Sequence, residues 1–471
     1  MAEVVLPSEP GKFAPAAAQG RGVTLTTVVV GAALAAGIVF RLFYPGTIEF
    51  GHDERFSFDH VTAVLNGGPW PALGMTMSIG GPNPGMSVWI FILLGLICRP
   101  TSPVGLAEAV QVLNIVALVG FVAFAIYAVP RREREPWLWA AALWAVNPLA
   151  IVYERKIWPP STLPVFMVAM LAGWWYRRSW WGSFVFALIA VVCGQIHPTA
   201  IFLALALAAW ALLEDRRSFR WSGLATGAVI GILPAAHWLL TYYAGGNSLH
   251  KLRPPMLTFY WRWLTTPFGY GPDHILGPVE FPRFLGWPEI GGTSTHVVLA
   301  IYAVIVGLAL AIVVPAVLRV AISGRPSLRW IVLGDTAAGC IVRAAFFGFG
   351  TILTVLTIRG GGLYPHYMIV ITPIMTLWVA LVAAFADGGA LRQRGRALLT
   401  ALCLCDAAVV ILLFSYIHAV GDIHGEFGPS LEWQGQNPRW RDRSDQRLSA
   451  LTIDGAQAAG RGTVQMPAYQ S

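Results

Sequence analysis

Charged residues are scarce in this chain: Asp, Glu, Lys and Arg together make up 12% of its 471 residues. A typical soluble domain carries about twice that share, so the composition excludes an ordinary soluble protein. Hydrophobic residues make up 56% of the chain and lie in repeated apolar runs, which are typical of membrane-spanning helices. Cysteine is also sparse. The five cysteines lie in or beside apolar runs, which argues against disulfides and metal sites and favours packing roles: Cys98, Cys193, Cys340, Cys403 and Cys405.

Eleven apolar runs of about 16 residues or more predict membrane spans. They are 22–44, 106–130, 137–152, 160–176, 181–196, 197–213, 221–243, 295–321, 331–357, 365–387 and 397–419. A twelfth run, 85–98, is only 14 residues long and is too short to span comfortably, so we expect an interfacial or re-entrant helix there. The sequence therefore predicts an all-α polytopic membrane protein with about eleven transmembrane helices and juxtamembrane helices in its first external loop.

The distribution of Lys and Arg predicts the orientation of these spans. The formal net charge is +8, and the arginines gather in clusters in short loops. This distribution is the one that the positive-inside rule describes for membrane proteins, so we do not interpret the charge as a sign of a nucleic acid partner. This rule places segment 1–21 in the cytoplasm and the transmembrane domain 22–419 in the cytoplasmic (inner) membrane. The first loop (45–105), a long loop (244–294) and a polar C-terminal tail (420–471) then share the extracytoplasmic face.

An acidic pair follows the first apolar run directly, in the sequence Gly51-His52-Asp53-Glu54-Arg55. Ionisable groups at a membrane boundary are costly and usually face a cavity or a partner. We expect a surface helix to begin at Asp53, where an acidic side chain is also favoured simply as an N-terminal cap. The functional alternative is a general base, which the nearby Arg55 would keep ionised.

Basic and aromatic side chains gather on the same predicted face. Arg155 and Lys156 precede Trp158-Pro159-Pro160 and would form a rigid cationic corner for a lipid phosphate, or would simply reach the headgroups. His197 lies between two apolar runs. Its side chain either packs in the protein interior or contacts the substrate. The remaining candidates for substrate contacts on this face are Lys251, Arg253, Arg359, His366 and Tyr367.

The order of these motifs resembles that of the GT-C glycosyltransferases, the integral-membrane enzymes of the protein O-mannosyltransferase and aminoarabinose-transferase type. The resemblance covers about residues 22–215. It rests on Asp53-Glu54, the segments 66–71 and 82–84, Asn147-Pro148 and Tyr153-Glu154-Arg155, with a later similar span at 358–387. The chain departs from the family pattern at Trp158-Pro159-Pro160, where an acidic residue is frequent, at His197, where Lys is common, and at His366, where Arg is common.

The resemblance implies transfer of a sugar from a polyprenyl-phosphate donor to a hydroxyl of a lipid, glycan or protein acceptor, with inversion. It implies Asp53 as the catalytic base with Glu54 beside it. Arg155, Lys156 and His366-Tyr367 would contact the donor phosphate or line the cavity. No cofactor is required, although Asp53, Glu54 and Asp59 could hold a divalent metal.

Two other functions remain open from the sequence. A transporter or flippase of polyprenyl-linked saccharides would also need basic residues for phosphate, together with polar residues along a path through several spans. Arg343, inside the run 331–357, is such a residue, and we expect it to pair with Asp335 or with a lipid. An envelope assembly protein without catalysis would use Asp53-Glu54 only as a helix cap.

Overall fold

The computed structural model describes residues 25–76, 81–242, 254–322, 336–358, 363–384 and 389–437. These residues are mainly helical, with two small antiparallel hairpins, Leu73–Thr76 (β1) with Pro82–Pro84 (β2) and Glu289–Ile290 (β3) with Thr293–Ser294 (β4). Six helical segments are long and apolar enough to cross a membrane. The prediction of an all-α, multi-pass membrane protein is confirmed at this level.

The described part of each of the eleven predicted runs is largely helical. The helices are α1 (Leu25–Leu42), α4 (Pro103–Tyr127), α5 (Arg134–Val146) with α6 (Pro148–Tyr153), α7 (Leu163–Trp175), α8 (Trp180–Ile196), α9 (Thr199–Glu214), α10 (Trp221–Ile232) with α11 (Ala236–Tyr242), α14 (Val297–Ile322), α16 (Ala337–Arg343) with α17 (Gly350–Ile358), α18 (Thr372–Ala384) and α19 (Gly389–Val420). Several of them are shorter than a bilayer requires, so the number eleven stays a prediction.

A proline divides the third predicted run into two helices. Asn147 ends α5 in an extended conformation, as residues before proline do, and its side chain accepts a hydrogen bond from the Ala150 backbone N–H to begin α6. Pro148 occupies the first position of α6, where its missing N–H is harmless. The chain therefore turns at membrane depth and delivers Tyr153 and the residues after it to one end of the bundle.

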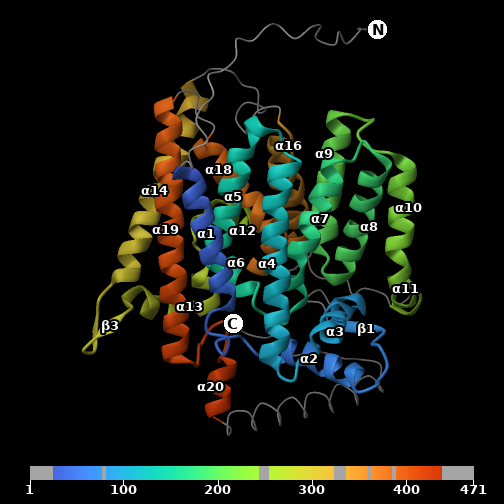
Figure 1. Cartoon of the computed structure of the whole chain (residues 1–471), viewed down its shortest axis with the longest axis horizontal. Coiled ribbons are helices and arrows are strands. Elements are labelled where there is room, and N and C mark those ends of the chain that lie inside the picture. Colours follow the sequence, from blue (N-terminus) through green and yellow to red (C-terminus); the bar gives the residue numbers. More distant parts are fainter. Residues whose placement is uncertain are drawn as a thin grey trace.

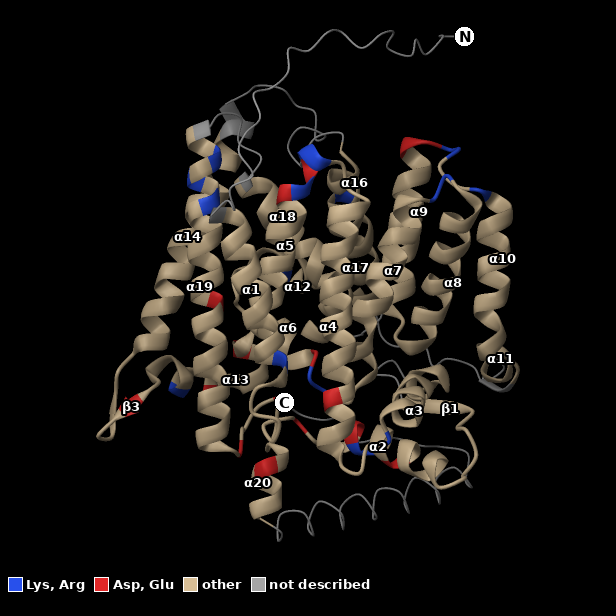
Figure 2. Ribbon diagram, viewed as in Figure 1, with Lys and Arg blue, Asp and Glu red and all other residues tan. Residues whose placement is uncertain are grey.

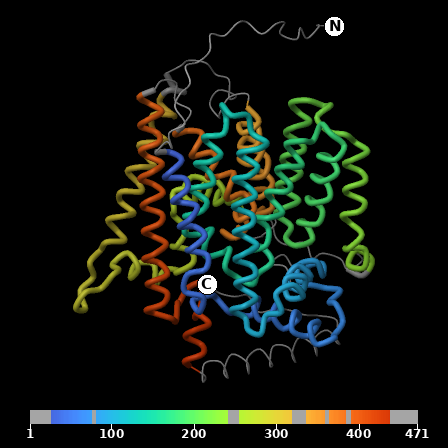
Figure 3. Tube along the Cα trace, viewed as in Figure 1, coloured from blue at the N-terminus to red at the C-terminus, as the bar shows by residue number. Residues whose placement is uncertain are grey.

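Helices α2 (His52–Leu65) and α3 (Met86–Cys98) lie across this end, which we call the α2 end (Figure 1). Helix α3 has 13 residues, close to the short apolar run expected at 85–98, and it packs between α2 and α4. The Cα trace shows α20 (Leu431–Gln436) at the same end, below α1 and α19 (Figure 3). Charged residues gather at the two ends of the bundle and are sparse between them (Figure 2).

The long external loop and the tail are partly ordered against this end. From residue 254 onward the loop forms α12 (Thr258–Thr265) and α13 (Pro272–Gly286). The tail returns to the first loop: the Leu431 N–H donates to the Ile48 carbonyl over 3.0 Å. Residues 438–471 of the tail and 244–253 of the loop lie outside the described residues.

Two buried arginines inside the bundle are paired with glutamates, whereas Asp406 of α19 is buried and its carboxylate oxygens have no hydrogen-bond partner among the described residues. The Arg41 Nε of α1 lies 2.8 Å from Glu154 Oε2, and both side chains are fully buried. The Trp144 indole of α5 donates to the other Glu154 oxygen over 2.7 Å. Arg343 pairs with Glu214 of α9 at 3.1 Å, while Asp335, the partner expected from the sequence, lies outside the described residues.

The buried Arg41–Glu154 pair generates a stability prediction. Arg41→Met should lower the free energy of unfolding by about 3–5 kcal/mol, because it leaves a buried carboxylate without its counter-charge. The thermal unfolding midpoint in detergent measures this effect, with Arg132→Met on an exposed arginine as the control. The double variant Arg41→Met/Glu154→Leu should recover most of the loss, since both charges are then replaced. A double variant no more stable than the single one would contradict this account.

Candidate functional site

The turn after α6 carries three consecutive buried charges, Glu154, Arg155 and Lys156. It ends at Trp158, whose extended backbone leads into Pro159 and the short 3₁₀ helix Pro159–Thr162. The Asn114 amide of α4 donates to the Glu154 carbonyl over 3.0 Å and to the Ser161 carbonyl over 2.9 Å. The turn is therefore held rigidly from behind, and each of its charges needs a partner.

Arg155 finds its partners on α1. Its guanidinium donates to the Phe40 carbonyl at 3.0 Å and to the Tyr44 carbonyl at 2.7 Å, and it lies over the Phe414 ring. These are the carbonyls that the end of α1 leaves without a helical partner. Arg155 is buried and holds the end of α1. Both terminal nitrogens of its guanidinium are used in these contacts, so they do not point towards a ligand.

Lys156 finds its partners on the first loop and on α2. Its Nζ lies 2.6 Å from Glu49 Oε2 and 3.6 Å from Glu54 Oε1. Burial disfavours the charged form of Lys156, but Glu49 and Glu54 outweigh it and raise the pKa of the lysine above its ordinary value. Burial also raises the pKa of both glutamates. The Lys156 ammonium group is thus the shared counter-charge of Glu49 and Glu54.

The two acidic residues at the start of α2 have different environments. Glu54 is buried, and its Oε2 accepts a hydrogen bond from the Gly51 N–H at 2.9 Å, as in a capping box. The Asp53 side chain is 44% exposed, and its Oδ2 accepts a hydrogen bond from the Trp158 indole at 3.1 Å. Its other oxygen lies 3.5 Å from the His52 ring, and this contact raises the pKa of His52. Of the pair, Asp53 is the carboxylate that a substrate can reach.

Trp158 connects Asp53 to the aromatic side of the site. The His366 ring packs edge-on against Trp158 with 4.5 Å between ring centroids, and the Lys156 Nζ lies 4.4 Å from the Trp158 ring. His197 in turn lies 5.8 Å from His366 and 5.3 Å from Tyr367, ring to ring. The structure therefore brings two segments distant in sequence, at Asp53 and His366, to the Trp158 indole, and His197 joins them through His366.

A second acidic group enters the site from the C-terminal segment. Glu426 contacts His274 of α13, and the Tyr153 hydroxyl lies 3.4 Å from Glu426 Oε2. Tyr153 is next to Trp158, with 6.1 Å between their rings. His274 and Glu426 are both about 30% exposed, so they can meet a ligand. In the described part of the site, three carboxylates act on the charge of Lys156, those of Glu49, Glu54 and Glu426, and Asp53 joins the site through Trp158.

Sequence reasoning missed Glu49, His274 and Glu426. Glu49 lies four residues before Asp53 but outside α2, in an isolated β-bridge with Ser430, so its place beside Lys156 depends on the fold. The sequence carries no signal for His274 and Glu426, because these residues meet only in the folded structure. Arg55 lies on α2 over the Phe50 ring at 5.7 Å. Lys251, Arg253 and Arg359 fall outside the described residues. Within the described ranges, no group of three or more His, Cys, Asp or Glu is arranged to hold a metal ion.

Replacing Lys156 should destabilise the fold in a pH-dependent way. Lys156→Met leaves Glu49 and Glu54 buried without a counter-charge, so unfolding should be easier by about 3–5 kcal/mol near neutral pH. Carboxyl groups with raised pKa bind more protons in the folded state, so stability falls as pH rises through their titration and recovers on acidification. Thermal unfolding between about pH 5 and pH 8 should show the defect shrinking towards pH 5, beyond any change in the parent. Lys156→Met/Glu49→Gln should be less sensitive to pH, and an equal defect at all pH values would contradict the assignment.

Comparison with known proteins identifies no close relative. No protein family profile and no curated protein sequence matches the chain. Among solved structures, it is similar to the oligosaccharyltransferase of Archaeoglobus fulgidus in the apo form, with a TM-score of 0.40 and 12% identity over 82% of this chain. The alignment covers 56% of the archaeal chain, so this protein spans about half the length of that one. A likeness of this degree establishes no family for the chain.

Proposed function

We propose that the protein is an integral-membrane glycosyltransferase that moves a sugar from a polyprenyl-phosphate donor to an acceptor hydroxyl, with inversion at the sugar. The observation that carries this proposal is the contrast between Asp53 and Glu54: one carboxylate is exposed and hydrogen-bonded to Trp158, while its neighbour is buried in the fold. Such an exposed carboxylate, held in place on a rigid surface, is what a general base requires.

In the proposed reaction, Asp53 takes the proton of the acceptor hydroxyl. The acceptor oxygen forms a bond to the anomeric carbon as the bond from that carbon to the phosphate oxygen breaks, and the phosphate leaves with the electron pair. Attack and departure occur on opposite faces, so the configuration inverts. A single displacement needs one carboxylate base, in contrast to the carboxyl pair of a glycoside hydrolase.

In the proposed mechanism Glu54 has a structural role and does not take part in proton transfer. One of its oxygens caps the start of α2 and the other faces Lys156, so both are occupied inside the protein. Lys156 therefore acts as a positioning residue, since its charge holds Glu49 and Glu54 and thereby the first turn of α2. The indole of Trp158 then fixes the direction of the Asp53 carboxylate.

The leaving phosphate needs positive charge, and the described site offers little that is uncommitted. Both terminal nitrogens of Arg155 donate to backbone carbonyls and its Nε is buried, so we leave it out of the phosphate site. Lys251, Arg253 and Arg359 stay our candidates for the phosphate. We assign His197, His366 and Tyr367 to the wall of the sugar cavity, where aromatic faces can pack on a sugar ring.

We place the α2 end on the extracytoplasmic side of the inner membrane. The short arginine-bearing loops between α4 and α5, α7 and α8, and α9 and α10 lie at the opposite end (Figure 2), and basic loops favour the cytoplasm. The alternative, a flippase for polyprenyl-linked saccharides, would need polar groups along the spans. Of the charged groups described inside spans, Arg41 and Arg343 are paired with Glu154 and Glu214, and Asp406 of α19 is buried and enclosed by the protein.

Asp53→Asn should abolish sugar transfer by purified protein supplied with a panel of polyprenyl-phosphate sugars. Loss of a general base lowers the rate by about 10²–10⁴-fold, while the amide keeps the shape of the side chain and the hydrogen bond from Trp158. Asp59→Asn, exposed on the same helix, is the matched control and should keep parental activity. Full activity in Asp53→Asn would overturn the assignment. Donor binding without turnover in the parent, together with movement of donor across vesicles, would support a flippase.

Trp158→Phe should lower kcat by about tenfold and leave donor binding nearly unchanged. The substitution keeps an aromatic ring against His366 but removes the indole N–H, and hydrogen bonds to charged groups contribute about 1.5–3 kcal/mol. A variant with unchanged kcat would show that the indole does not position the base.

A further inference from the structure

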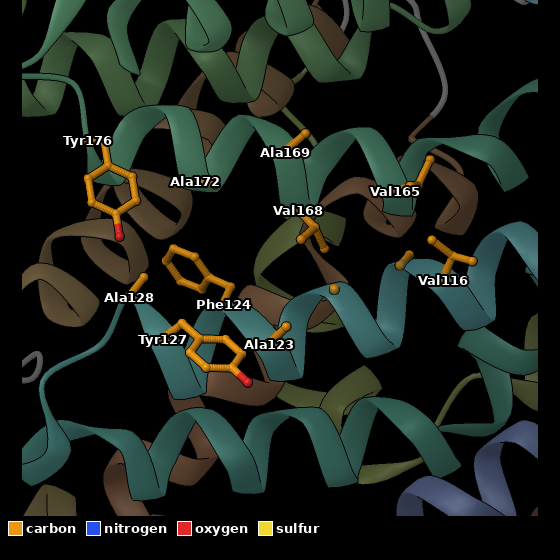
Figure 4. Close-up of a pocket in the computed structure, with 12 residues that line it drawn as sticks. Val116, Ala123, Phe124, Tyr127, Ala128, Val165, Val168, Ala169, Ala172 and Tyr176 are labelled. Carbon is orange, nitrogen blue, oxygen red and sulfur yellow. The ribbon is translucent and has the colours of Figure 1, made fainter. Parts of the chain in front are cut away.

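An apolar groove runs along α4 and α7 on the outer surface of the bundle, away from the site (Figure 4). Its volume is about 420 Å³, and its lining is almost entirely hydrocarbon. It extends from Val116 and Val165 to Tyr127 and Tyr176, which lie together at one end of the groove in the close-up. This volume falls in the range of ligand-binding pockets.

The groove exists because small side chains recur at helical spacing on both helices. Gly120 and Ala123 on α4 face Ala169 and Ala172 on α7, which leaves space where larger residues would interdigitate. Phe124, at the floor, is held by ring contacts to Trp137 and Trp175, each at 5.4 Å, so it stays in place. The groove is therefore formed by rigid elements.

The groove faces the bilayer. Helix α4 is long and apolar enough to cross a membrane, and on the groove side Val116 is 54% exposed and Tyr127 84% exposed. Water does not reach an apolar surface at this depth, so hydrocarbon covers it. The occupant is accordingly a lipid chain that lies along the two helices.

The end of the groove indicates which lipid supplies that chain. Tyr127 and Tyr176 have the position of an interfacial aromatic belt, at the end opposite α2. Arg131 and Arg132 follow α4 after three residues, and both are exposed. Exposed arginines beside an apolar groove at the membrane surface favour a negatively charged headgroup.

We propose that this groove binds one acyl chain of an anionic phospholipid from the leaflet opposite the α2 end, with its headgroup at Arg131 and Arg132. The bound chain fills the space between α4 and α7. Helix α4 also holds the turn of the site: Asn114, two residues before Val116, donates to the Glu154 and Ser161 carbonyls. A phospholipid in the groove therefore stabilises the scaffold behind the site without contacting the substrate.

Native mass spectrometry of the full chain tests this, with phosphatidylglycerol and phosphatidylcholine of identical acyl chains added to the detergent-purified protein. The parent should retain one phosphatidylglycerol more tightly than phosphatidylcholine. Ala123→Phe fills the groove and should weaken that retention by about tenfold, since displacing roughly two buried methylene groups has this effect. Val119→Phe is the matched control, because Val119 is exposed on the same helix but does not line the groove.

A second pair of variants tests the headgroup. Arg131→Gln/Arg132→Gln should remove the preference for phosphatidylglycerol and leave the weaker retention of phosphatidylcholine intact. Equal retention in Ala123→Phe and Val119→Phe would overturn the proposal, as would equal retention of the two lipids by the parent. If Ala123→Phe keeps its phospholipid but loses turnover of a polyprenyl-phosphate sugar, the groove holds the donor chain instead, and the phospholipid proposal fails while the transferase proposal stands.

Discussion

The whole α2 end depends on one constraint: three consecutive charged residues are buried in the turn after α6, and each requires a partner away from water. Glu154 is satisfied by Arg41 and Trp144, Arg155 by the last carbonyls of α1, and Lys156 by Glu49 and Glu54. These partners come from α1, α5, the first loop and α2. The turn therefore acts as a common anchor, and none of these elements can shift without exposing a buried charge.

The same constraint separates the roles of Asp53 and Glu54. Adjacent residues on a helix point in directions about 100° apart, so when Glu54 turns inward to Lys156, Asp53 must point elsewhere. It reaches the rim of the site, where Trp158 donates its indole N–H. Trp158 belongs to the same anchored turn, so the buried charges that stabilise the fold also position the exposed carboxylate assigned to catalysis.

The two ends of the bundle have different chemistry. At the α2 end, carboxylates and histidines from distant segments surround one lysine, while the opposite end carries arginines of short loops. Between them the spans carry few charges, and Arg343 pairs with Glu214. This difference between the two ends is what the proposed membrane enzyme with a single reactive face requires. The outer surface of α4 and α7 lies between the two charged ends and can bind hydrocarbon.

The sequence by itself determined the helical, membrane-embedded class, the short helix at 86–98 and the surface helix that begins beside Asp53. All of these follow from local properties: the length of an apolar run and the acidic start of a helix. Only the tertiary structure decided what the charges do. Arg155 and Lys156 look alike in sequence, yet one holds α1 and the other holds α2, and Glu426 meets His274 from more than a hundred residues away. Long-range packing determines these partners. A buried charge needs a counter-charge or hydrogen bonds, and the residues that supply them lie far away in the sequence, so no local sequence pattern identifies them.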